Sequence, residues 1–161
     1  MKTTAVLLVL LLAAGCSGSS GTSPTLLPPR PSTTSPGGSI PSEEVAHISG
    51  AIDSTNESLT LLASDLGSGN RGQAKRDATT LSARASELTD LLVSDSSLFT
   101  GATAESVYSS VYAWSDGAAV LSGEILVAGI DTSGYPGFAQ RATSFTSQTA
   151  TLQQQLKDLS A

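Results

Sequence analysis

Apolar residues recur at alternating spacings of three and four positions in four separate segments of the chain. This period of about 3.5 residues is typical of an α-helix that presents one apolar seam to neighbouring helices. A half-buried β-strand would show an alternation of period two, and no stretch sustains one. The pattern therefore predicts four α-helices, at about residues 42–66, 70–95, 103–130 and 136–160.

Each predicted helix carries one seam of apolar or small residues. The four seams run from Val45 to Leu66, Ala74 to Leu92, Ala104 to Ala128 and Phe138 to Leu159. Helices of matched length that are joined by short connections favour antiparallel neighbours. We therefore expect an all-α fold, an up-down-up-down antiparallel four-helix bundle over residues 42–161.

The charges fit this arrangement. The 161-residue chain has 8 Lys and Arg against 14 Asp and Glu, a net charge of −6. The predicted first and third helices carry acids but no Lys or Arg, and they are diagonal in an up-down bundle, so each lies beside two helices that carry cations. Exposed ion pairs contribute only about 0–1 kcal/mol each. The acidic balance is poorly suited to nucleic acid, so we expect no nucleic-acid partner.

An apolar run precedes the predicted bundle. Residues 5–14 are all apolar, Lys2 lies before them, and Gly15 and Cys16 follow. A membrane-spanning helix needs about 20 apolar residues. The run is shorter and is typical of the core of a secretory signal peptide. Cys16 is the only cysteine in the chain, so no intramolecular disulfide is available to stabilise the fold.

The end of this run, Leu12-Ala13-Ala14-Gly15-Cys16, resembles the lipobox of bacterial lipoproteins, although Ala13 stands where leucine is usual. The resemblance implies cleavage between Gly15 and Cys16 and a diacylglycerol on the Cys16 thiol. Two acyl chains would anchor the protein stably to the extracytoplasmic face of the cell membrane, because each buried CH₂ contributes about 0.8 kcal/mol. The alternative is an ordinary secretory signal with a chance cysteine.

Residues 16–41 are dominated by Ser, Thr, Pro and Gly and show neither a helical nor a strand period. This composition predicts a disordered linker between the lipidated cysteine and the folded domain. A mixed flexible chain of this length has an end-to-end distance of about 25–30 Å. We therefore expect a signal peptide at 1–15, a linker at 16–41 and one helical domain at 42–161.

Residues that could support catalysis or bind a metal are sparse. His47 is the only histidine and is expected on the outer side of the first helix, so no tetrahedral metal site is expected around it. No Gly-x-Ser-x-Gly motif is present. Gly67-x-Gly69-x-x-Gly72 follows a predicted helix, whereas a dinucleotide-binding loop follows a strand. We expect no catalytic residue, no metal and no cofactor, and hence no enzyme.

The predicted third helix has more apolar residues than one seam requires. A second stripe beside the seam consists of Tyr112, Ala113, Ala119, Val120, Leu126 and Val127. An exposed apolar patch usually marks a surface for a partner or a ligand. The alternative is that this helix is buried more deeply by its neighbours, so that the stripe belongs to the core.

These observations predict a non-catalytic protein-interaction or scaffolding module at the cell envelope, with a protein partner on the second stripe. The alternative is a carrier or sensor that binds a small apolar or lipid-like ligand between the helices. The many Ala and Thr residues on the seams could leave room for such a ligand.

Overall fold

The computed structural model describes residues 39–128 and 135–160, which are almost entirely helical. The elements are α1 (Ser42–Gly67), α2 (Arg71–Ser94), a 3₁₀ turn η1 (Ser96–Leu98), α3 (Ala102–Val127), α4 (Tyr135–Thr146) and α5 (Thr149–Lys157). The prediction of an all-α fold is confirmed. None of the helices in these residues is both long and apolar enough to cross a bilayer.

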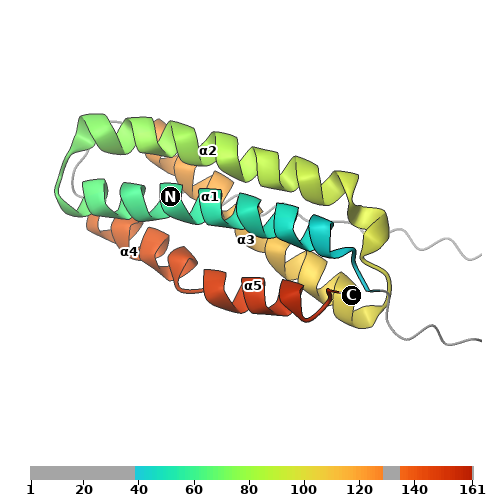
Figure 1. Ribbon diagram of the computed structural model, residues 1–161. Coiled ribbons are helices and arrows are strands. Elements are labelled where there is room, and N and C mark those ends of the chain that lie inside the picture. Colours follow the sequence, from blue (N-terminus) through green and yellow to red (C-terminus); the bar gives the residue numbers. More distant parts are fainter. Residues whose placement is uncertain (1–38, 129–134, 161) are drawn as a thin grey trace, which may run out of the picture. The chain divides into compact units, whose positions relative to one another are not determined.

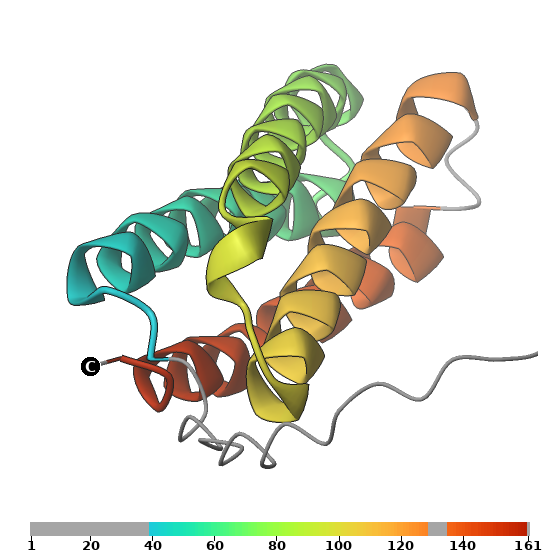
Figure 2. The same cartoon turned by 90° about the vertical axis from the view of Figure 1, so that its right-hand side faces the viewer.

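The helices pack against one another along their lengths (Figure 1). α1 contacts α2 on one side and α4 and α5 on the other, while α3 contacts α2 extensively and α4 and α5 much less. Figure 2 shows the end at which α1 begins, with η1 crossing from α2 to α3. The apolar core lies between these helices.

Most of the core lies on the predicted seams. Every seam residue of α1 and α2 is buried, and so are those of α3 as far as Ile125. Ile52, Leu81 and Leu121 have no exposed surface at all. Full burial of one such side chain stabilises the folded state by about 1.5–3 kcal/mol. With no disulfide available, this packing is the main source of stability.

Ile40 corrects the predicted linker boundary. Its side chain is fully buried, and its backbone N donates to the carbonyl oxygen of Leu159 at 2.9 Å. It also forms an isolated parallel bridge with Ser160. One apolar residue shows no period, so the sequence pattern missed it. The predicted signal peptide and residues 16–38 of the predicted linker lie outside the described residues.

The single helix predicted at 136–160 is wrong, because the chain breaks at Ser147 and Gln148 between α4 and α5. The hydroxyls of Thr146 and Ser147 each donate to the carbonyl three residues earlier, at 2.8 Å. Such bonds compete with the regular helical pattern of the backbone. The 3–4 spacing of the seam continues through the break, so periodicity alone did not reveal it.

Candidate interaction surface

The structure divides the predicted second stripe between solvent and core. Tyr112 is 38% exposed, Val120 50% and Val127 86%. Ala119 and Leu126 are half-buried and pack against the core. Part of the stripe is therefore exposed, and the rest is covered by neighbouring helices. The exposed part, called the α3 stripe below, consists of Tyr112, Ala113, Val120 and Val127.

Acidic side chains share this face of α3. Asp116 lies four positions after Tyr112 and four before Val120, so it projects from the same side of the helix. Glu105 lies seven positions before Tyr112 on that side. Both carboxylates belong to exposed residues, and α3 contains no Lys or Arg. The α3 stripe is thus apolar surface interrupted by negative charge.

A row of aromatic rings supports Tyr112. Its ring stacks on that of Tyr108, with centroids 6.0 Å apart and planes 23° apart. Tyr108 meets Phe99 edge to face at 5.3 Å and 62°, and Phe99 is only 4% exposed. Each such pair contributes about 0.5–1.5 kcal/mol beyond its buried area. Phe99 lies in the connection after η1, outside any seam, so the sequence pattern did not predict its burial.

One close contact joins α4 to α3. A Cβ on Gly117 would come within 2.7 Å of Phe145 Cζ, so the Phe145 ring packs directly on the α3 backbone. Trp114, which is 3% exposed, donates from Nε1 to the Phe145 carbonyl oxygen at 3.0 Å. Gln148 N donates to the same oxygen at 3.1 Å. The prediction that Trp114 belongs to the core is confirmed, and its hydrogen bond lies beside the α4–α5 break.

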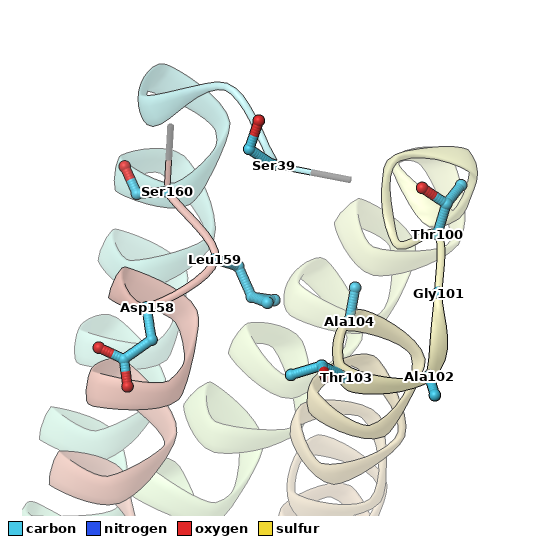
Figure 3. A pocket seen from close by; sticks show the side chains of 9 residues that line it. All are labelled: Ser39, Thr100, Gly101, Ala102, Thr103, Ala104, Asp158, Leu159 and Ser160. Carbon is cyan, nitrogen blue, oxygen red and sulfur yellow. The ribbon is translucent and has the colours of Figure 1, made fainter. Parts of the chain in front are cut away.

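A groove continues from this contact along α3 and α5. Three hollows of about 490, 420 and 300 Å³ follow one another there. The first and second share Gln155, and the second and third share Thr103 and Leu159. Figure 3 shows the third hollow, which lies between Leu159, just after the end of α5, and Ala104 of α3. We call the three hollows together the α3–α5 groove. The sequence pattern did not predict this groove, although the short side chains on one side of α3 leave room for one.

His47 lies on the outer side of α1, as predicted. It lines a hollow of about 480 Å³ between α1 and α2, together with Arg84 and Glu87. These two residues form an exposed ion pair at 2.9 Å. Across the part of the chain that the structure describes, His, Cys, Asp and Glu do not gather in groups of three or more that could hold a metal ion.

Two carboxyl groups meet beside the turn between α1 and α2. Asp77 is 8% exposed. Its Oδ1 accepts from Gln73 Nε2 at 2.9 Å, and its Oδ2 is buried without a hydrogen-bond partner. The pKa of Asp65 is raised above its usual value, mainly by a hydrogen bond with Asp77 and also by burial and the negative charge of Asp77. The positive charge of Arg76 acts in the opposite direction and lowers this pKa. A protonated Asp65 carboxyl would have a hydrogen to donate to the Asp77 carboxylate.

We expect this pair to make stability depend on pH. The folded pKa of Asp65 is raised, so the folded state binds the proton more tightly than the unfolded state does. The resulting stabilisation is complete below the unfolded pKa of about 4 and is lost as pH rises through the raised pKa. In urea unfolding, Asp65→Asn should abolish this decrease of stability with rising pH. The same variant should raise the free energy of unfolding at pH 7. Asp90→Asn, at an exposed position of α2, is the control. An equal effect of both variants would contradict the assignment.

No protein-family model matches the chain, and no curated protein or solved structure is significantly similar to it. The residues predicted for cleavage and lipidation, Gly15 and Cys16, lie outside the described residues. Inference about function therefore depends on the sequence of this chain and the α3 stripe.

Proposed function

We propose that this protein is an extracytoplasmic lipoprotein, anchored to the cell membrane through Cys16, whose helical domain is a non-catalytic protein-interaction module. The lipobox-like sequence at residues 12–16 supports the anchor. The exposed α3 stripe is the observation that carries the interaction role. The partner is a protein, and the role needs neither a cofactor nor a metal.

We further propose that the domain is an up-down-up-down antiparallel bundle in which α4 and α5 together form the fourth rod. α2 contacts both α1 and α3, and α4 contacts both α3 and α1. The connection from α1 to α2 covers only residues 68–70. Such a short connection favours a following helix that runs back alongside the previous one. In this arrangement α1 and α3 are diagonal, and the α3 stripe lies on the outside.

The chemistry of the α3 stripe defines the partner. Val120 and Val127 leave apolar surface in water, and burying it would contribute about 25 cal/mol per Å². In a symmetric dimer through this face, Asp116 and Glu105 of one copy would approach the same carboxylates of the other copy. The repulsion between these like charges opposes such a dimer. A partner with an apolar surface bordered by Lys or Arg fits better.

Replacing Tyr112, Val120 and Val127 together with Ser should abolish partner binding and leave the fold intact. These side chains are exposed, so their loss removes apolar contact surface but little core packing. The measurement is photo-cross-linking in the source cells from a reactive amino acid at Ala113, which is exposed on the same helix. The wild type should give one discrete cross-linked product, and the triple variant should give none.

The matched control replaces Leu61 and Val93 with Ser, because these residues are 53% and 55% exposed on α1 and α2. This control should keep the cross-linked product. A product that survives in the triple variant would place the partner elsewhere. A triple variant that unfolds in circular dichroism would show that the stripe belongs to the core.

A further inference from the structure

A short segment before α1, residues 39–41, joins the two ends of the described domain, and we call it the N-terminal strap. Ile40 has no exposed surface and belongs to the apolar core. Its backbone N donates to the carbonyl oxygen of Leu159, just after α5, at 2.9 Å, and it pairs with Ser160 in an isolated parallel bridge. Pro41 is the N-cap of α1, so the strap leads directly into that helix. Figure 2 shows the segment before α1 reaching the end of α5.

α5 depends on attachments to other parts of the chain because it is short. It has 9 residues, and isolated helices of fewer than about 12 residues are only marginally stable in water. Two side-chain hydrogen bonds attach it to α1: Thr149 donates to Asn56 at 2.9 Å, and Gln153 donates to Asp53. Among the described residues after Gln153, the hydrogen bonding to the rest of the chain comes from the backbone of Ile40. The strap therefore fastens the end of α5 that these side chains leave free.

The other helices have contacts that do not involve α5. α1 contacts α2 and α4 more extensively than it contacts α5, and α2 contacts α3. α4 is attached to α3 by the hydrogen bond from Trp114 Nε1 to the Phe145 carbonyl oxygen and by the ion pair of Arg141 with Glu124. The break at residues 147–148 separates these contacts from α5. Segments with few buried apolar contacts open locally while the rest of a protein stays folded.

We propose that the N-terminal strap is a conformational switch for α5: withdrawal of the Ile40 side chain releases α5 from the bundle while the other helices stay folded. Release would expose Leu152 and Leu156, the buried apolar residues of α5. The chain from Cys16 reaches the domain at this strap, so a pull on that chain acts on Ile40 before it acts on a helix. This switch goes beyond the interaction role proposed above and depends neither on the lipid anchor nor on the α3 stripe.

The test is amide hydrogen exchange, measured by mass spectrometry on the full-length protein purified in detergent from its source cells. Ile40→Ala removes the buried side chain but keeps the backbone N–H that bonds to Leu159. Exchange in residues 152–160 should accelerate by about tenfold or more, because truncation of a buried isoleucine favours the open state. Exchange in α2 and α3 should stay within about twofold of the wild type, since these helices remain packed. Ile40→Val removes one methyl group and should accelerate exchange in residues 152–160 by about twofold to tenfold.

Ile52→Ala is the matched control, because Ile52 is also an isoleucine with no exposed surface but lies within α1. It should accelerate exchange in α2, which the two strap variants leave unchanged. Acceleration confined to α5 and the strap in Ile40→Ala supports the proposal. Equal acceleration in α2 and α5, or none in α5, overturns it. If Ile40→Ala unfolds in circular dichroism, Ile40→Val decides by the same comparison.

Discussion

Replacing Trp114 with Ala is expected to lower the free energy of unfolding by about 3–5 kcal/mol, as is usual for a buried aromatic residue. The side chain is 3% exposed, and its Nε1 donates to the Phe145 carbonyl oxygen at 3.0 Å. Its removal leaves a cavity between α3 and α4 and breaks the hydrogen bond beside the α4–α5 break. Trp114→Phe keeps most of the ring and should cost about 1 kcal/mol for the lost hydrogen bond. Urea denaturation followed by circular dichroism measures both.

Val127→Ala is the control on the same helix, since Val127 is 86% exposed. It should change the free energy of unfolding by no more than about 0.5 kcal/mol. Amide hydrogen exchange of Trp114→Ala should also accelerate most in α4 and α5, because that side chain connects them to α3. If Trp114→Ala lowered the free energy of unfolding as little as Val127→Ala does, the result would contradict a core role for Trp114.

Replacing Cys16 with Ser is expected to abolish the lipid anchor completely. A serine hydroxyl cannot form the thioether to diacylglycerol, and the lipobox resemblance makes that modification a condition for cleavage after Gly15. In the source organism, the wild type should incorporate an alkyne-labelled fatty acid and partition into detergent. Cys16→Ser should take up no label and retain residues 1–15.

Ser17→Ala is the control for this experiment, because it changes the neighbouring residue and leaves the thiol in place. It should be labelled and cleaved like the wild type. Labelled fatty acid on Cys16→Ser, or a wild type that is never labelled, would remove the anchor from the proposed function.

The burial of α1, α2 and most of α3 could be predicted from the sequence because it depends on a local property. A residue such as Leu81 is buried when it lies on the apolar side of its own helix, and the 3–4 spacing shows that side directly. The same reasoning identified Trp114 as a core residue. It also placed His47 outside the core.

The candidate surface was predictable only in part. Tyr112 and Leu126 both belong to the second stripe in the sequence, but Leu126 packs against the core while Tyr112 remains 38% exposed. Which side of a broad apolar helix is covered depends on where the neighbouring helices lie. The sequence of α3 does not contain that information.

The sequence by itself determined the helices, the seams that form the core and the lipobox-like segment from which the anchor is inferred. Only the tertiary structure showed the break between α4 and α5, beside which Trp114 Nε1 reaches the Phe145 carbonyl from another helix. It likewise decided that Ile40 belongs to the fold, through a hydrogen bond to Leu159 at the far end of the domain sequence. Such contacts join residues that are distant in the chain, whereas periodicity records only which residues share one side of one helix.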